Sequence, residues 1–212
     1  DLWAAPLEKS SGREVTLDPY YAMVQVEPGG AAEFVLMQPF TPAGKDNMIA
    51  CLVARCDGEH RGERHVALYP KQELIYGPRQ IEARIDQDGA ISQLLTLWSQ
   101  HGSNVLRGTL LVMPIGQALL YVEPLYLQAE NGGLPELKRV ILAHGDRIEM
   151  GENLQDALGR LVGGMDASSE APQPPMSGAV PPVARRAGGL DPSRALGLFK
   201  AAEAALQNGD WV

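Results

Sequence analysis

Two long apolar runs that are separated by only two residues constrain the fold most. Residues 105–115 and 118–128 are rich in leucine, valine and tyrosine, and a glycine opens the turn at 116–117. A two-residue loop that begins with glycine is typical of a β-hairpin, because glycine adopts a positive φ at little cost. After the glycine-rich turn at 131–133, the chain continues with two shorter strand-like runs. The pattern therefore predicts an antiparallel meander over 104–150.

The rest of the chain up to residue 162 divides into further strand-like and helix-like segments. Runs of β-forming residues bounded by turn residues are typical of strands, whereas apolar residues three and four apart are typical of helices. The first pattern predicts hairpins over 20–40 and 48–69, and the second predicts helices over 79–87, 90–100 and 152–162. We therefore expect an α+β fold: a mostly antiparallel sheet of hairpins and a meander with a few short helices, plus a helical tail.

Composition changes near residue 165 and divides the chain into three parts. Residues 1–165 are the expected antiparallel α+β core domain. Residues 166–190 carry five prolines, three glycines and no aromatic residue, a composition that favours a flexible linker. An Asp-Pro pair at 191–192 then predicts the start of an amphipathic helix over 191–212, which we interpret as part of a truncated helical tail.

The charge balance excludes one class of partner. The formal net charge is −8, and an acidic surface repels the phosphate backbone of nucleic acids. The chain has no run of 18 or more apolar residues that could span a bilayer. It begins with Asp1 and stops soon after a helix-like segment. We interpret it as a soluble piece cut from a longer protein.

The two cysteines, Cys51 and Cys56, indicate neither a disulfide nor a metal site. On one strand they would lie roughly 16 Å apart, beyond the ~7 Å between Cα atoms that a disulfide can bridge. None of the four histidines falls in a metal-binding spacing such as H-E-x-x-H, and no G-x-S-x-G motif for a serine nucleophile is present. We expect two packed free thiols, and neither a metal nor another cofactor.

The densest polar segment lies within the helix expected over 79–87, which starts with Arg79. Glu82 and Asp86 are one turn apart and share a face, and Gln80 and Arg84 have the same spacing. Two carboxylates on one face could help to hold a hard cation such as calcium. Calcium, however, usually takes about six or more oxygen ligands, and no loop in the sequence supplies them. The alternative interpretation is a solvated charged face or a network of ion pairs.

Glu123 is the most informative single residue. It stands in a run over 119–127 that is otherwise apolar or aromatic, and strand alternation places it on one face with Tyr121 and Leu125. A carboxylate there needs a partner or a sheet edge, and Pro124 favours an edge or a bulge. A buried carboxylate could have a raised pKa and act as an acid or base. The alternative is a structural ion pair.

Arg107 is the nearest basic candidate to pair with Glu123, and the expected register separates the two. With a turn at 116–117, Glu123 faces Leu110, and Arg107 faces Tyr126. Because successive residues alternate between faces, Arg107 and Glu123 would lie on opposite faces unless a bulge intervenes. The partners that this register favours instead are Arg79, Arg84 and Arg139.

Four segments carry a family resemblance. They read EFVLMQPFTP at 33–42, DNMIA at 46–50, YGPRQIEARIDQ at 76–87 and LLYVEPLYLQAE at 119–130. Together they resemble the bacterial group called uncharacterised protein family 0182, over about 17–162 and more loosely in the tail. Two positions depart from the family pattern: Cys51 stands where tryptophan is usual, and Gly89 where proline is usual.

The resemblance implies a membrane context. Members of that family have several N-terminal transmembrane helices followed by a large domain outside the cytoplasm, and this chain resembles the C-terminal part of that domain. The resemblance thus implies a cell-membrane location on the extracytoplasmic side. It also implies the protein's own transmembrane region as a partner, besides a possible homo-oligomer or envelope component. It carries no catalytic residue over to this chain.

Three functions remain open from the sequence. The first is a non-catalytic extracytoplasmic domain that binds a ligand, an envelope component or another subunit. The second is a cell-envelope hydrolase that uses Glu123 with Glu82 or Asp86 as its acid and base. The third is a vestibule over a transport path. The candidate ligand-binding residues are Arg79, Gln80, Glu82, Arg84, Asp86, Arg107 and Glu123.

Overall fold

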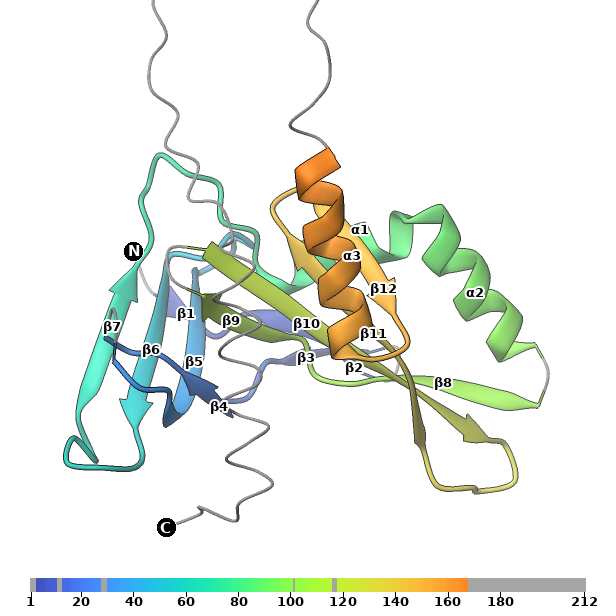
Figure 1. The fold of residues 1–212 in the computed structure, drawn as a ribbon, viewed down its shortest axis with the longest axis horizontal. Helices are drawn as coiled ribbons and strands as arrows, with labels where there is room; N and C mark the ends of the chain where they lie inside the picture. Colours follow the sequence, from blue (N-terminus) through green and yellow to red (C-terminus); the bar gives the residue numbers. More distant parts are fainter. Residues whose placement is uncertain (1–2, 11–12, 28–29, 101, 116–117, 168–212) are drawn as a thin grey trace, which may run out of the picture.

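The structure is a computed structural model that contains two antiparallel sheets, a short ribbon and three helices in its described part (Figure 1). The described residues are 3–10, 13–27, 30–100, 102–115 and 118–167. The α+β class expected from the sequence is confirmed. The helix expected over 191–212 and nearly all of the linker expected over 166–190 lie outside the described residues.

The N-terminal sheet has five strands and contains both expected hairpins. β5 (Glu33–Pro42) lies at its centre, with β6 (Ala50–Arg55) on one side and β4 (Tyr20–Val24) on the other. β7 (Arg64–Leu68) pairs with β6, and β1 (Trp3–Ala4) pairs with the end of β5. The order across the sheet is therefore β1-β5-β6-β7 with β7 at an edge, and β4 pairs with β5 off this path.

A two-stranded ribbon precedes this sheet and was not predicted. It consists of β2 (Leu7–Ser10) and β3 (Arg13–Thr16). The sequence over 1–19 is mixed in character, so no apolar period indicates it.

The C-terminal sheet is the expected meander. Its order is β12 (Arg147–Gly151), β11 (Glu136–His144), β10 (Ala118–Ala129) and β8 (Ser103–Arg107), and β9 (Leu111–Ile115) also pairs with β10. All of these pairs are antiparallel. The strand expected over 105–115 is therefore two strands rather than one.

A β-bulge at 108–110 separates β8 from β9. β9 has the expected register, since Val122 pairs with Leu111, but β8 pairs Arg107 with Leu125 instead of Tyr126. One extra residue on the first strand therefore intervenes, and the Gly108 N–H donates to the Pro124 carbonyl at 2.8 Å. Because strand side chains alternate with a period of two, this insertion reverses the face of every residue before it.

The helices cover both faces of the C-terminal sheet. α1 (Pro78–Gln87) and α2 (Gly89–Ser99) meet at Asp88, whose carboxylate accepts the first free N–H groups of α2. α1 and α2 contribute to one apolar cluster, on the face of the sheet that carries Leu125 and Ile141. α3 (Leu154–Ala167) covers the opposite face, which carries Leu120 and Leu142.

α3 continues through Gly163 and Gly164, so the helix end expected there is wrong. Glycine within a helix costs only about 1 kcal/mol relative to alanine. Packing of the leucine face of α3 on the sheet outweighs a cost of that size.

The two sheets meet along β4 and β9. The Tyr20 hydroxyl donates to the Val112 carbonyl at 2.8 Å, and the Val112 N–H donates to the same hydroxyl at 3.0 Å. Leu111 and Met113 of β9 pack against the apolar cluster on the inner face of the N-terminal sheet. Figure 1 shows the three helices gathered around the C-terminal sheet, with the N-terminal sheet beside them.

Candidate functional site

Arg107 brings two of the predicted polar residues together. Its Nη1 lies 2.5 Å from Asp86 Oδ1 on α1, and its Nη2 donates to Glu123 Oε2 at 2.9 Å on β10. Its Nε also donates to the second oxygen of Glu123. Glu123 has an exposed fraction of 0%, so the pair is a buried, bidentate ion pair. The prediction that Arg107 and Glu123 lie on opposite faces is therefore wrong, and the bulge at 108–110 is the reason.

The arginines expected to pair with Glu123 have other partners. Arg84 donates to the Gly145 carbonyl at 2.6 Å, and Arg79 pairs with Glu14 at 3.3 Å. Arg139 donates to a backbone carbonyl and lies over the Trp98 ring, 5.6 Å from its centre. These three side chains do not converge on Glu123.

The other residues of the predicted helix face are also engaged. Gln80 Oε1 accepts the Gly77 N–H at the start of α1, at 3.0 Å. Glu82 is 1% exposed and lies one turn before Asp86 on the same helix. The seven candidate residues therefore do not line one open cleft. Asp86, Arg107 and Glu123 meet, and the other four lie around α1.

Glu8 joins this group and was missed by sequence reasoning. It is buried, and its Oε2 accepts the Leu110 N–H within the bulge at 3.2 Å. Burial raises the pKa of Glu8, the Leu110 N–H opposes that rise, and the nearby charge of Glu123 adds to it. Its partner stands 102 residues away in the chain, so no local pattern indicates the contact. We call Glu8, Asp86, Arg107 and Glu123 the Arg107 cluster.

The Arg107 cluster links elements rather than opening to a substrate. Burial alone would lower the pKa of Arg107, but the hydrogen bonds and charges of Glu123 and Asp86 together raise it. The arginine is therefore held charged between the two carboxylates. A glycosidase-type hydrolase needs two carboxyl groups that both reach the substrate. Glu123 and Glu82 are closed off by the core, so the geometry does not support that alternative.

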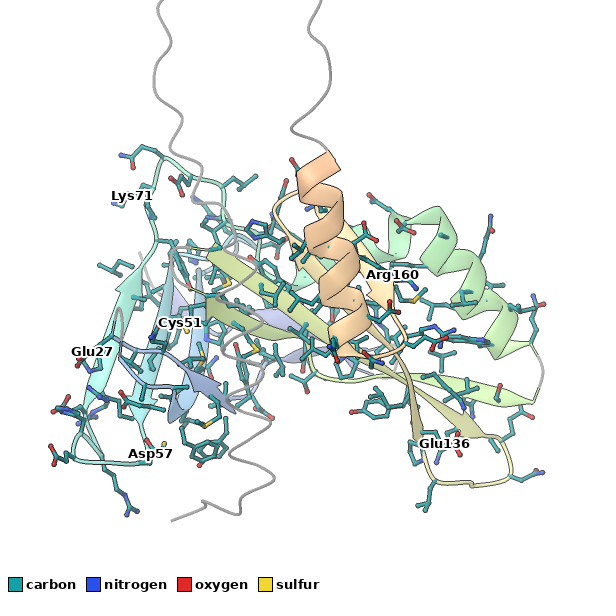
Figure 2. The ribbon with its side chains drawn as sticks, viewed as in Figure 1. Glu27, Cys51, Asp57, Lys71, Glu136 and Arg160 are labelled. Carbon is teal, nitrogen blue, oxygen red and sulfur yellow. The ribbon has the colours of Figure 1, made fainter. Side chains whose placement is uncertain are left out.

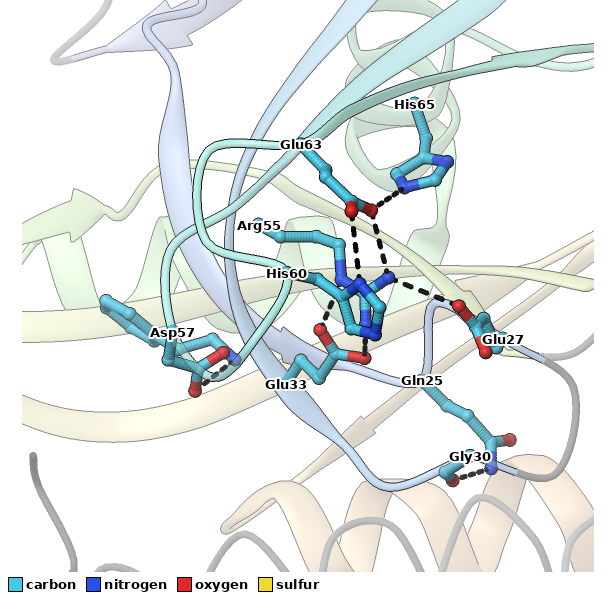
Figure 3. Close-up of polar contacts among 10 residues, drawn as sticks. Gln25, Glu27, Gly30, Glu33, Arg55, Asp57, His60, Glu63 and His65 are labelled. Atoms are coloured by element: carbon cyan, nitrogen blue, oxygen red, sulfur yellow. Dashed lines mark hydrogen bonds and ion pairs between the residues drawn. The ribbon is translucent and has the colours of Figure 1, made fainter.

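Another arginine, Arg55, is buried at the end of β6 and contacts three glutamates (Figure 3). It binds Glu33 through two hydrogen bonds of 2.6 and 2.5 Å, and its Nη1 lies 3.2 Å from Glu27 and 3.5 Å from Glu63. His60 and His65 both contact Glu63. The Glu33 hydrogen bonds raise the pKa of Arg55. Glu27 and Glu33 flank the turn between β4 and β5, and Glu63 lies in the loop between β6 and β7. Arg55 therefore holds the turn ends of the two hairpins together.

A pocket of about 520 Å³ lies in the seam between the two sheets. Its walls come from β6 and β7 on one side, from β9, β10 and the β11–β12 turn on the other, and from the segment 69–76. Cys51, one of the lining residues, is labelled on the N-terminal sheet in Figure 2. Among the described residues, no group of three His, Cys, Asp or Glu side chains could hold a metal ion.

Comparison with known proteins decides the family. Residues 1–98 match the family described as Uncharacterised protein family (UPF0182). A UPF0182 protein of Desulforamulus reducens is 46% identical over 222 residues, which cover 100% of this chain and 23% of the relative. A UPF0182 protein of Trichodesmium erythraeum is 51% identical over 163 residues, which cover 77% of this chain and 18% of the relative. The chain belongs to the UPF0182 family.

The UPF0182 chain corresponds to only part of its relatives. A relative from Geobacter sp. (strain M21) is 46% identical over 215 residues, and the chain again spans 23% of its length. No solved structure matches the chain. Within the described residues, no helix has both the length and the apolar character that crossing a bilayer requires.

One face of this UPF0182 chain is apolar and has no helix over it among the described residues. Side chains of the N-terminal sheet alternate between an inner face, packed against β9, and an outer face, which we call the open face. The helices pack instead on β8, β11, β12 and the ribbon. The apolar side chains of the open face are Trp3, Tyr21, Met23, Phe34, Leu36, Phe40, Leu52, Val66 and Leu68.

The open face is partly ordered by its own aromatic contacts. The rings of Tyr21 and Phe34 stack with centroids 5.0 Å apart, and those of Trp3 and Phe40 lie 5.6 Å apart. Leu68 nevertheless remains 68% exposed, and Tyr21 remains 59% exposed. The face therefore combines a preformed surface with apolar area that is open to solvent.

Proposed function

We propose that this chain is a non-catalytic assembly module that docks through the open face onto another part of the same, longer polypeptide. One observation carries the proposal: the five-stranded N-terminal sheet presents apolar side chains from every strand on a face that no described helix covers.

Such a face favours a permanent partner. Soluble monomers rarely expose contiguous apolar patches beyond a few hundred Å². Permanent interfaces are more apolar than transient ones and resemble a domain core cut in two. Sheet faces are normally buried against a second layer, and the open face lacks that layer among the described residues. The two aromatic pairs support docking because rings already in contact lose little side-chain entropy when a partner covers them.

The share of the relatives that this chain covers supports an intramolecular partner. The chain spans 23% of the length of the Desulforamulus relative, so most of a polypeptide of that length would lie outside it. A segment of the same polypeptide has a high effective concentration at the open face and binds without the cost of bringing two molecules together.

The family resemblance adds a location to the proposal. It implies transmembrane helices outside this chain and a position for the module on the extracytoplasmic side of the cell membrane. The apolar partner surface would then belong to the part of the polypeptide that joins the module to those helices.

Photocrosslinking in the full-length protein tests the proposal. The photoreactive residue p-benzoylphenylalanine replaces Leu68 on the open face or, as a matched control, Leu134, which is 89% exposed. Leu134 lies in the loop between β10 and β11, away from β7 (Figure 1). We expect position 68 to give an intramolecular crosslink to a segment outside this chain, identified by mass spectrometry of the digest. Position 134 should give none.

Two outcomes would refute the proposal. A product of twice the monomer mass at position 68 would identify a second copy as the occupant. The absence of any crosslink at position 68, with efficient photolysis, would show that the open face faces solvent.

A further inference from the structure

We propose that the pocket between the two sheets binds a neutral, largely apolar small molecule that carries one hydrogen-bond donor. The cavity volume of about 520 Å³ falls within the range of ~300–1,000 Å³ that is usual for small-molecule sites. The pocket lies on the inner side of the N-terminal sheet, so this proposal does not depend on docking at the open face.

The walls of the pocket are mainly apolar and come from three directions. Val53 and Ala67 line it from the N-terminal sheet, and Pro114 and Leu119 line it from the C-terminal sheet. The segment 69–76 closes a third side, and the Met48 N–H fixes that segment by donating to the Ile75 carbonyl at 2.9 Å. An apolar body buried between these walls would gain about 25 cal/mol for each Å² removed from water.

Tyr69, Tyr76 and Tyr121 add aromatic surface to the pocket. The hydroxyls of Tyr121 and Tyr69 differ in whether they are free to form a hydrogen bond with a ligand. The Tyr121 hydroxyl donates to the Tyr76 carbonyl at 2.5 Å and is therefore committed to the protein. The Tyr69 hydroxyl has no hydrogen-bond partner among the described residues, although the ring lines the pocket. Tyr69 is half-buried, so its hydroxyl can accept or donate one hydrogen bond to a ligand in place of solvent.

His144 supplies an acceptor beside the same pocket. Its Nδ1 lies 3.0 Å from the Leu119 carbonyl oxygen, and a carbonyl can only accept, so Nδ1 carries the hydrogen. In the neutral ring, Nε2 then has a free lone pair. A ligand hydroxyl or amine N–H can donate to this nitrogen or to Tyr69, which is why the proposal includes one donor.

The charge of the lining selects against anions. Glu73 is the charged side chain among the lining residues at neutral pH. Burial raises the pKa of the Cys51 thiol to about 12 and raises the pKa of Tyr69 and Tyr121 as well, so these groups stay neutral. Arg84, whose guanidinium lies 4.8 Å from the centre of the Tyr76 ring, is paired with Asp146 at 3.5 Å.

A matched pair of fluorescent probes tests this selectivity on the full 212-residue chain in detergent-free buffer. N-phenyl-1-naphthylamine is neutral and apolar with one N–H donor, and 1-anilinonaphthalene-8-sulfonate is the same molecule with a sulfonate added. We expect saturable binding of the neutral probe at one site, with a dissociation constant of ~10–100 μM for a ligand of this size. The sulfonate should bind at least about tenfold more weakly, because it brings a negative charge close to Glu73 and loses part of its hydration against apolar walls.

Two variants in the pocket and two control variants on the open face locate the binding. Ala67→Trp fills the cavity from an exposed edge strand and should lower the affinity for the neutral probe at least about tenfold. Tyr69→Phe removes one hydroxyl and should lower it about fivefold, the effect of one hydrogen bond. Tyr21→Phe and Leu68→Ser alter the open face and should leave the affinity unchanged. Circular dichroism confirms that each variant is folded.

Several outcomes would overturn the pocket proposal. The first is that the sulfonate probe binds as tightly as the neutral probe or more tightly. The second is that Leu68→Ser abolishes binding of the neutral probe while folded Ala67→Trp retains it. Unchanged affinity in both Ala67→Trp and Tyr69→Phe would do the same. None of these results bears on the crosslink at position 68, so the two proposals fail separately.

Discussion

Arg107 makes it possible for a carboxylate to lie in the core of this molecule. Glu123 is fully buried, and the guanidinium supplies two hydrogen bonds and a compensating charge. Removing one partner of such a pair leaves an uncompensated buried charge, which costs more than the pair itself contributes. Asp86 shares the same arginine, so the interaction also fastens α1 to the sheet.

Truncation of the arginine should therefore be strongly destabilising. We expect Arg107→Ala to lower the free energy of unfolding by about 3–5 kcal/mol in urea unfolding. The double variant Arg107→Met/Glu123→Leu should recover most of the loss because the buried charge of Glu123 is removed together with its partner. Arg79→Ala is the matched control, since its ion pairs are about half exposed and such pairs contribute ~0–1 kcal/mol. Equal effects of Arg107→Ala and Arg79→Ala would show that the pair does not hold the core.

Glu8 should make stability depend on pH. Its pKa is raised in the folded state by burial and by Glu123, so folding favours the protonated acid. Its contribution to the free energy of unfolding therefore falls as the pH rises from the unfolded value through the raised folded value. Glu8→Gln removes this titration and keeps an acceptor for the Leu110 N–H. We expect Glu8→Gln to be more stable than the wild type at pH 7.5, with the difference vanishing near pH 4. A pH-independent difference would exclude this role.

The bulge between β8 and β9 is the local feature that determines the Arg107 cluster. It shifts the register by one residue, brings Arg107 onto the face of Glu123 and presents the Leu110 N–H to Glu8. Gly108 lies so close to Pro124 that an added Cβ would clash with its ring and carbonyl oxygen. The bulge therefore requires glycine at this position.

Gly108→Ala should disturb the bulge. We expect a loss of about 1–3 kcal/mol in urea unfolding, the usual cost of overpacking. Gly89→Ala is the matched control, because its Cβ would meet nothing within 4 Å in the first turn of α2. That substitution should stabilise the chain by ~0.4–1 kcal/mol. A neutral Gly108→Ala would show that the bulge tolerates a side chain.

The sequence predicts most elements but not the bulge or Glu8. The hairpins, the meander and α1 and α2 follow from apolar periods and turn residues, which act over a few neighbours. Gly108 within the run and Pro124 on the partner strand are both compatible with a bulge, but they do not determine that one residue is inserted at 108–110. Glu8 stands in a stretch without a clear period, and its burial depends on a contact across the whole chain. Local patterns therefore locate the elements, whereas long-range packing decides which side chains meet.

The molecule consists of two sheets that share a narrow junction. One hydroxyl, that of Tyr20, both accepts from and donates to the backbone of Val112 across this junction. The inner face of the N-terminal sheet is covered by the junction, and the pocket occupies the rest of the seam. Under our proposal, the outer face receives the partner.

Loss of this hydroxyl should weaken the junction. Tyr20→Phe leaves the Val112 N–H and carbonyl without their partner, which costs ~1–3 kcal/mol for buried groups. Tyr21→Phe, one residue along, changes a side chain that is 59% exposed and should be within ±0.5 kcal/mol of the wild type. Urea unfolding of both variants checks this, and equal stabilities would mean that the sheets are held together by apolar contacts alone.

The accessibility of a thiol on the open face is the most direct test of docking. Leu68→Cys and Leu134→Cys are introduced separately, with the partly buried Cys56 replaced by serine. The rate of reaction with a polar maleimide is then compared between the 212-residue chain and the full-length protein. We expect the rate at position 68 to fall at least about tenfold in the full-length protein, because the partner must open before the thiol reacts, while the rate at position 134 stays the same. Equal rates at position 68 in both proteins would refute docking at the open face.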